Sequence, residues 1–179
     1  MKIYSLFICL VLVVACSETP GEKPKSIPTE YAQKFAALSA NIWRDTNGHV
    51  HIKSENDLAT MAAFGYIHAT DRAWQMDYFR RVVQGRSAEV HGYYKLRVDI
   101  MMRLVGLYEQ AEQIASSLDP STSELFWAYA YGVNKSFAET NFDDIYEFKK
   151  LGYKPLPWTP TDTIALILLQ SFDQTRQTF

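Results

Sequence analysis

Hydrophobic residues recur along most of this chain at the three- and four-residue spacing that lines one face of an α-helix. This spacing predicts helices in five regions: residues Tyr31–Ser39, Asp57–Gln84, Leu96–Ser116, the segment after Ser121-Thr122-Ser123-Glu124, and a last helix that starts at Thr159. The stretch NIWRDTNGHVHIK (residues 41–53) instead alternates around Asn47-Gly48, a pair that tolerates positive φ. We therefore predict a hairpin of Asn41–Arg44 with Val50–Lys53, and a fold that is mainly α with a short N-terminal β-hairpin.

Several helix boundaries are indicated by capping residues. Ser54 and Asp57 resemble a capping box, and Ser121 with Glu124 forms another. Thr159 precedes a proline and an acidic residue, which is the usual order at a helix start. Within Asp57–Gln84 we expect two helices, or one helix bent near Gly65. Gly85 stands where a left-handed C-terminal cap would end the segment.

Residues 65–92 combine aromatic residues with four arginines, which raises the question of a basic binding surface. The formal net charge of the whole chain is −2, from 18 basic and 20 acidic residues, and this argues against a nucleic-acid-binding protein. Met76, Phe79 and Val83 follow helical spacing and predict an apolar stripe. Arg80 and Arg81 flank that stripe, so we interpret them as a solvated or salt-bridged helix face.

The N-terminal residues 1–16 predict a bacterial lipoprotein signal peptide, because one lysine precedes a short apolar stretch that ends in a lipobox, Val13–Cys16. Residues 17–30 are polar and rich in proline, which predicts a flexible tether. The domain would then occupy residues 31–179. Cleavage would remove Cys9 and leave Cys16 as the lipidated N-terminus, so we expect a lipid-anchored protein of the cell envelope that faces the periplasm, with outer-membrane sorting favoured by Ser17.

Candidate catalytic residues are few. His49 and His51 would point to the same face of a strand and could bind a metal with His68 or Asp45 as a third ligand. Two exposed hairpin histidines explain the same spacing without a metal. The sequence contains no G-x-S-x-G, no H-E-x-x-H and no glycine-rich phosphate loop. The residues alone therefore predict no self-contained active site.

A series of short motifs resembles the α-chain of the penicillin acylase family of N-terminal-nucleophile hydrolases. The matching segments, in chain order, are Arg44-Asp45, Asn47-Gly48 and His51-Ile52; Gly65-Tyr66, Asp71-Arg72, Trp74-Gln75-Met76, Arg80-Arg81, Gly85 and Ala88-Glu89-Val90; Asp99, Met102-Arg103 and Gly106-Leu107; Tyr129-Ala130 and Gly132-Val133-Asn134; Glu147-Phe148, Leu151-Gly152-Tyr153, Pro155, Pro157-Trp158-Thr159-Pro160 and Asp162. The chain departs from the family pattern at His49, where an apolar residue is usual, and at Val50, where proline is usual. The resemblance implies the α-chain portion of an αββα N-terminal-nucleophile hydrolase, in which the 65–92 segment is a structural helix whose arginines pair with carboxylates.

The resemblance also implies where the catalytic groups lie. In this family one precursor is cut into an α-chain and a longer β-chain, and the β-chain supplies the nucleophilic N-terminal serine and the oxyanion hole. That serine follows a glycine, and this sequence contains no Gly-Ser pair. We therefore expect no catalytic residue, cofactor or metal ligand in this chain, although the complete enzyme could bind calcium. The last helix would form one wall of the acyl pocket through Leu168, Ser171, Phe172 and Thr175.

The function implied by the resemblance is hydrolysis of the amide bond of N-acyl compounds, such as β-lactam side chains or acyl-homoserine lactones. The partners would be the β-chain, the N-acyl amide and, through Cys16, a membrane. We expect this chain alone to be inactive. The alternative is a non-catalytic, lipid-anchored protein made of a truncated or repurposed α-chain that binds a partner. Such a chain would expose the apolar face Ile164–Leu169.

Overall fold

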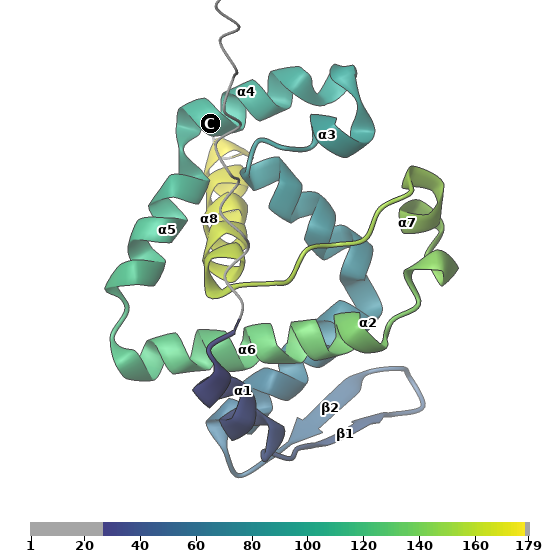
Figure 1. The fold of residues 1–179 in the computed structure, drawn as a ribbon, viewed down its shortest axis with the longest axis vertical. Helices are drawn as coiled ribbons and strands as arrows, with labels where there is room; N and C mark the ends of the chain where they lie inside the picture. The colour runs from purple at the N-terminus through teal and green to yellow at the C-terminus, as the bar shows by residue number, and fades with distance from the viewer. Residues whose placement is uncertain (1–26, 178–179) are drawn as a thin grey trace, which may run out of the picture.

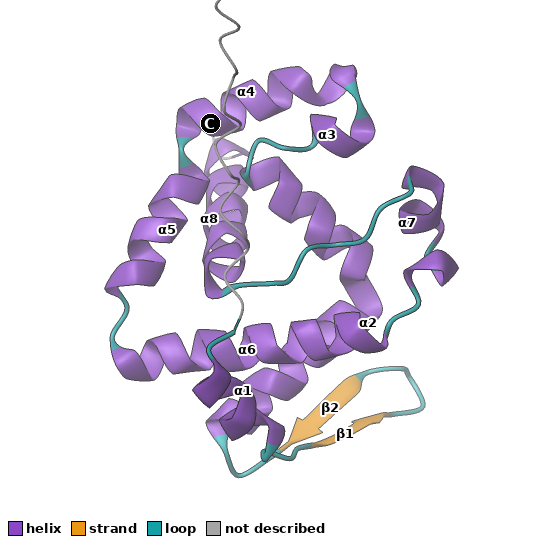
Figure 2. Cartoon of the chain, in the orientation of Figure 1, coloured by secondary structure: helices purple, strands orange, loops and turns teal. Residues whose placement is uncertain are grey.

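The computed structural model describes residues 27–177, and Figure 1 shows several helices arranged as a frame around two long inner ones, α2 and α8. The elements are α1 (Thr29–Ala36), β1 (Asn41–Arg44), β2 (Val50–Lys53), α2 (Asp57–Val83), α3 (Ala88–His91), the 3-10 turn η1 (Tyr93–Lys95), α4 (Leu96–Val105), α5 (Leu107–Ser117), α6 (Pro120–Glu139), the 3-10 turn η2 (Phe142–Asp144), α7 (Tyr146–Leu151) and α8 (Pro160–Gln177). Helices dominate, and the two strands form the one sheet among these residues (Figure 2). The predicted fold class is confirmed.

The long helices α2 and α6 cross at two glycines and form the centre of the fold. A Cβ atom built on Gly65 would lie 2.1 Å from the carbonyl oxygen of Tyr129, and one built on Gly132 would lie 1.8 Å from that of Ala62. Both distances are far below a van der Waals contact. The two backbones therefore touch, and only glycine fits at either position.

The predicted bend near Gly65 is wrong, because the backbone of α2 leaves helical geometry at Arg72, with φ −137° and ψ 25°. The close contact with α6 holds Gly65 in a straight helical turn. The helix begins at Asp57 as predicted, but its N-terminal cap is Asn56, whose side chain accepts a hydrogen bond from the Ala59 amide at 3.1 Å. Ser54 instead accepts from the Asn56 amide and so orders the residue that does the capping.

Two other helix boundaries differ from the sequence pattern. Leu96–Ser116 was expected to be one helical region, but Gly106 adopts φ 73° and separates α4 from α5. The start of α6 is capped by Asp119, which accepts from the amides of Ser121 and Thr122 at 3.0 Å, so the capping box predicted from Ser121 to Glu124 is wrong. Proline at the first position of this helix makes Asp119 the better cap. Gly85, by contrast, adopts φ 61° after the end of α2, as predicted.

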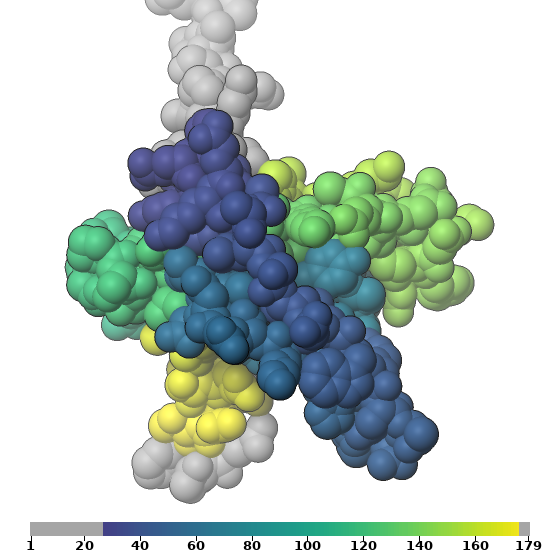
Figure 3. Space-filling view, turned by 90° about the horizontal axis from the view of Figure 1, so that it is seen from below, coloured from purple at the N-terminus to yellow at the C-terminus, as the bar shows by residue number. Residues whose placement is uncertain are grey.

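The hairpin has the predicted strands, with Trp43 opposite His51 and Arg44 opposite Val50. Of the two turn residues, only Gly48 uses a positive φ, 84°. The hairpin projects from the helical body, as the blue segment in Figure 3 shows. Arg44 fixes it to α2 through two hydrogen bonds to the carboxylate of Asp71, at 2.6 and 2.7 Å.

Two clusters of buried side chains lie between the helices. One joins α2 and α6 to η2, α7 and Trp158, and the other joins Val83 to residues of α5 and α8. Met76 and Val83 belong to these clusters, whereas Phe79 remains 39% exposed, so the predicted apolar stripe is right at two of its three positions. The expected exposure of the Ile164–Leu169 face is wrong for Ile164, which is 5% exposed because it packs in the second cluster, although Ile167 is 52% exposed.

None of the helices in residues 27–177 is both long enough and apolar enough to cross a membrane. The predicted signal peptide, Cys16 and most of the tether lie outside the described residues. The first turn of α1, at Thr29 and Glu30, overlaps the predicted end of the tether.

Candidate functional site

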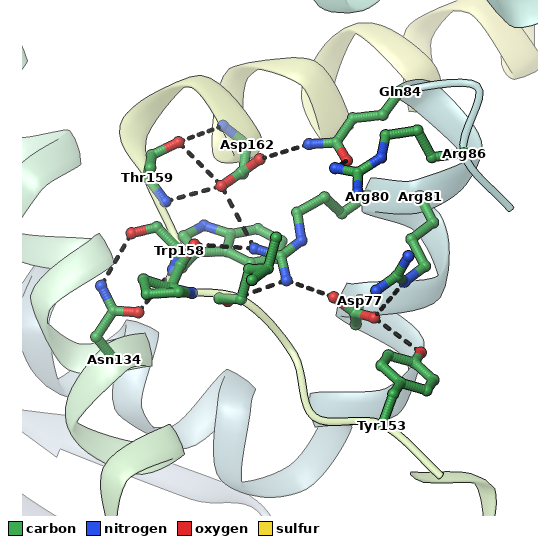
Figure 4. A network of polar contacts seen from close by, with 12 residues as sticks. Asp77, Arg80, Arg81, Gln84, Arg86, Asn134, Tyr153, Trp158, Thr159 and Asp162 are labelled. Carbon is green, nitrogen blue, oxygen red and sulfur yellow. Dashed lines mark hydrogen bonds and ion pairs between the residues drawn. The ribbon is translucent and has the colours of Figure 1, made fainter. Parts of the chain in front are cut away.

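A buried cluster of charged residues joins the C-terminal half of α2 to the start of α8 (Figure 4). Asp77 is fully buried at its centre. One carboxylate oxygen accepts from the Arg81 Nε at 3.0 Å and from the hydroxyl of Tyr153 at 2.8 Å, and the other accepts a short hydrogen bond from Arg80. Every face of this carboxylate thus has a donor, which is the condition for keeping a charge in a protein interior.

Arg80 connects this centre to backbone segments that follow 76 and 77 residues later in the chain. Its guanidinium donates to the carbonyl oxygens of Pro157 at 3.1 Å and Leu156 at 3.0 Å. It also lies 3.6 Å from the carboxylate of Asp162 in the first turn of α8. Because the side chain of Arg80 is only 5% exposed, these contacts hold α8 on α2 in a defined position.

Asn134 of α6 and the loop before α8 hold each other from the opposite side of the cluster. The Asn134 side chain accepts from the Trp158 amide at 2.7 Å and donates to its carbonyl oxygen at 2.9 Å. The indole of Trp158 is 1% exposed, lies against the Arg80 guanidinium at 5.1 Å, and donates to Thr163 at 2.9 Å. Three helices are therefore fixed to one another at this point.

The pKa values of the two buried carboxylates, Asp77 and Asp162, are shifted in opposite directions. Burial alone would raise the pKa of Asp77, but the positive charges of Arg80 and Arg81 and the Tyr153 hydroxyl hold it below its usual value. Burial raises the pKa of Asp162, and Arg80 and Thr159 offset this only in part. Burial beside Asp162 also raises the pKa of Tyr108 to about 12, so this phenol stays protonated. The same burial therefore leaves the pKa of one carboxylate lowered and that of the other raised, because Asp77 has two arginine partners and Asp162 has one.

An open cavity of about 660 Å³ lies beside the cluster. Its walls include Arg81, Tyr108 and Asp162 together with Trp127 of α6. The two buried charged groups among them already have partners within the chain: Arg81 donates to Asp77 and Glu89, and Asp162 accepts from Thr159, Gln84 and Tyr108. Because their hydrogen bonds are made within the chain, these two groups stabilise the walls of the cavity and are not available to a ligand.

The four residues predicted for the acyl-pocket wall lie on α8, further along the helix than this cavity, and none of them lines it. Leu168 and Phe172 are half-buried and pack against the second cluster. Ser171 and Thr175 are exposed, and each hydroxyl donates to a carbonyl oxygen of its own helix at 2.9 Å. One side of the helix therefore packs inward and the other carries small polar side chains to the surface.

The histidines considered as metal ligands have partners in the structure. His49 and His51 both lie 3.2 Å from the Oδ2 atom of Asp45, and His51 stacks on Trp43. His68 is elsewhere, 2.9 Å from the hydroxyl of Tyr129, and burial lowers its pKa. Across residues 27–177 no group of three or more histidine, cysteine or acidic side chains is arranged to hold a metal ion. The buried carboxylates of Asp77 and Asp162 are paired with arginines, and that of Asp99 accepts from the amides of Ser87 and Ala88, so these residues do not fit a calcium site.

Several of the short motifs that resemble the penicillin acylase family form hydrogen bonds with one another in the fold. Besides the pairing of Arg44 with Asp71 and of Asn134 with Trp158, Asp99 accepts from the amides of Ser87 and Ala88, and Arg103 donates to the carbonyl oxygen of Gly85. Two arginines of the 65–92 segment, Arg80 and Arg81, pair with Asp77 as expected, but these pairs are buried and do not form a surface. Arg86 pairs with Glu89 nearer the surface, and Arg72 is exposed. Sequence analysis assigned no role to Asp77, although its spacing of three and four residues from two arginines indicates an intrahelical ion pair.

The sequence model of the family described as Penicillin amidase matches residues 39–179. Acyl-homoserine lactone acylase QuiP from Pseudomonas putida is 31% identical over 166 residues, which covers 92% of this chain and 20% of the relative. The Penicillin acylase 2 proenzyme from Pseudomonas sp. (strain SE83) is 32% identical over 142 residues, covering 78% of this chain and 18% of the relative.

A similar fold occurs in the thermostable penicillin G acylase from Alcaligenes faecalis, with a TM-score of 0.64 and 24% identity over 71% of this chain and 69% of that one. At this identity the likeness concerns the fold alone. The chain spans about a fifth of the length of the curated relatives it matches. The family match covers well over half of its residues and includes the hairpin, the glycine crossing and the charged cluster, so this chain belongs to the penicillin amidase family.

Proposed function

We propose that this chain is the N-terminal, α-chain part of an amidase that hydrolyses the amide bond of N-acyl compounds. The single observation that carries the proposal is the family match from the hairpin to α8. Relatives with this region are named as acyl-homoserine lactone acylase and as penicillin acylase, and both names describe cleavage of an acyl group from an amine. The acyl group and the amine of the substrate are left open between these two classes.

In this proposal the nucleophile belongs to a second, longer chain. Its N-terminal serine would attack the amide carbonyl while its own α-amino group takes the hydroxyl proton. The C–N bond would then break, the amine would leave with that proton, and water would hydrolyse the acyl-enzyme to release the carboxylic acid. The described histidines do not need to take part, since His49, His51 and His68 are engaged with Asp45 and Tyr129.

The role of this chain is then to position α8. Ser171 and Thr175 would line one wall of the acyl pocket, while Leu168 and Phe172 hold the helix against α5. The charged cluster supports this role because Arg80 fixes the start of α8 to α2 through contacts from which water is excluded. A helix held this firmly at its start presents its later residues to a partner in one orientation.

The proposal is tested by purifying the protein from the bacterium that makes it, with an affinity tag inserted in the predicted tether (residues 17–30), under conditions that preserve complexes. We expect a second, longer chain with an N-terminal serine to copurify. The complex should release carboxylic acid from octanoyl-homoserine lactone or from phenylacetyl amides, whereas the chain alone should release none. Hydrolysis by the isolated chain would contradict the division of roles, and a complex without activity on any N-acyl amide would contradict the amidase assignment.

We also propose that Cys16 is lipidated and that the protein is anchored in the cell envelope, facing the periplasm. The support is the sequence Val13–Cys16 after an apolar stretch and the polar segment that follows it.

A further inference from the structure

Helix α4 exposes its apolar side to solvent and turns mostly polar residues toward the rest of the fold. Among the described residues, fifteen large hydrophobic side chains are exposed, and the short segment Tyr93–Val105 contains seven of them. Leu104 is 83% exposed and Ile100 is 51% exposed. The helix runs along one edge of the frame in Figure 1, away from α6.

The residues that hold α4 in place are mostly polar. Asp99 is 4% exposed and accepts hydrogen bonds from the amides of Ser87 and Ala88 at 2.9 and 2.7 Å, so it anchors α4 to the start of α3. Arg103 donates to the Gly85 carbonyl oxygen at 2.9 Å, and Met102 is the one apolar side chain of this helix that is fully buried. The apolar residues on the outer side are therefore not needed to attach the helix to its own fold.

At 3.6 residues per turn, the exposed positions cover about half of the helix circumference. We call this set the α4 outer face; its members are Leu96, Arg97, Ile100, Met101, Arg103, Leu104 and Val105. Five of these seven residues are apolar. Arg103 lies at one edge of the face and is bonded to Gly85, whereas Arg97 lies in the middle of the apolar residues. An exposed apolar surface of this kind is typical of a contact with another molecule.

We propose that the α4 outer face is a docking surface for the second, longer chain of the acylase, which would cover Ile100 and Leu104 with apolar groups and pair a carboxylate with Arg97. This inference rests on the proposed function. Its support is the exposed face itself and the length of the relatives, of which this chain spans only about a fifth.

Arg97 is the residue that favours a protein partner over two other occupants. A membrane would have to take up a guanidinium from the middle of the buried face, which costs free energy because the side chain must bend back to reach the headgroups. A second copy, joined by a two-fold axis through this face, would bring two Arg97 side chains together. A different chain can supply a carboxylate at that position, and a charge-assisted pair in a dry interface contributes to specificity.

The test uses the full chain in the bacterium that makes it, with a photo-cross-linking amino acid in place of Leu104. We expect ultraviolet light to join this position to the second chain of the acylase, identified by mass spectrometry. A cross-link only to lipid, only to another copy of this chain, or to no identified molecule would overturn the proposal.

Charge substitutions give an independent measurement. Leu104→Asp and Arg97→Glu should each reduce the amount of second chain that copurifies by more than tenfold, whereas Arg97→Lys should retain it. Tyr146→Asp is the matched control, because this residue is 67% exposed on α7 and does not belong to the α4 outer face. Circular dichroism should show that all four variants fold.

The two proposals fail in different ways. If the second chain copurifies equally with wild type, Leu104→Asp and Arg97→Glu, the docking surface is wrong and the proposed function stands. If wild type brings down no second acylase chain, the proposed function fails, and the docking surface fails with it.

Discussion

Gly65 and Gly132 lie where α2 and α6 cross, and each faces the backbone of the opposite helix with no room for a Cβ atom. The close crossing of α2 and α6 therefore requires that neither position carries a side chain. This is a backbone contact, and no rotamer change of a neighbouring side chain can relieve a substitution there.

We expect Gly132→Ala to lower the free energy of unfolding by about 3 kcal/mol or more, because the added methyl group forces the two helices apart. Urea denaturation followed by circular dichroism measures this. The control is Gly152→Ala, which adds a methyl group into open space and meets only the strain of its φ of 69°, roughly 1–2 kcal/mol. Equal losses in the two variants would contradict the close contact.

Asp77→Asn should destabilise the chain by about 3–5 kcal/mol, because two buried arginines would lose their shared carboxylate. Arg81→Met should cost less than Arg80→Met, since Arg81 contacts Glu89 near the surface whereas Arg80 joins α2 to α8. The same denaturation experiment ranks the three variants. A loss below about 1 kcal/mol for Asp77→Asn would show that the cluster contributes little.

The dependence of stability on pH should differ between the two buried carboxylates. The pKa of Asp77 is lowered in the folded chain, so its contribution is present above the unfolded value of about 3.9 and is lost as the pH falls below it. The pKa of Asp162 is raised, so its contribution is complete below about pH 4 and is lost as the pH rises through the raised value.

Unfolding free energies measured between pH 3 and pH 7 test this expectation. The stability difference between wild type and Asp77→Asn should shrink toward low pH, whereas that between wild type and Asp162→Asn should shrink toward neutral pH. Parallel curves would contradict the assignment of opposite shifts.

Ser171→Leu should change which acyl groups the two-chain enzyme accepts and leave stability nearly unchanged, because this side chain is exposed and bonds only its own helix. A larger side chain on the proposed pocket wall should lower kcat/KM for long acyl chains more than for short ones. Phe172→Ala is the opposite case, because it should cost about 2 kcal/mol of stability through lost packing. Unchanged specificity in Ser171→Leu would remove this residue from the pocket wall.

Cys16→Ser should move the protein from the membrane fraction to the soluble fraction, because lipidation requires the cysteine thiol. Fractionation and mass spectrometry of the mature N-terminus measure this. Cys9→Ser is the control. It should leave the distribution between membrane and soluble fractions unchanged, since the predicted cleavage removes that residue. A Cys16→Ser protein that stays in the membrane fraction would contradict the anchor.

The sequence was sufficient for the hairpin, the order of helices and several of their ends, because these depend on local residues such as Asn47-Gly48, Gly85 and Thr159. The capping residues were harder to identify. Asn56 and Asp119 compete with nearby serines that have equal intrinsic preference, and the structure decides by the geometry of the preceding turn. The kink at Arg72 has no glycine or proline to indicate it.

Only the local ion pairs of the charged cluster could be predicted from the sequence. The pairing of Asp77 with Arg80 and Arg81 is local and follows from helical spacing. The pairing of Arg80 with Asp162 is not local, and its burial depends on how α8 and the preceding loop pack on α2. The same reason explains why Phe79 is exposed although helical spacing placed it in the apolar stripe.

The distance along the chain between Arg80 and its later partners also sets an order of events during synthesis. At roughly 5–20 residues per second, the ribosome makes α2 several seconds before Asp162 and the Pro157 carbonyl exist. During that interval we expect Arg80 and Arg81 to remain hydrated and to keep the nascent helix soluble. Docking of α8 and its preceding loop then removes water from Arg80, so a residue that is hydrated in the growing chain becomes the one that fixes α8 to α2.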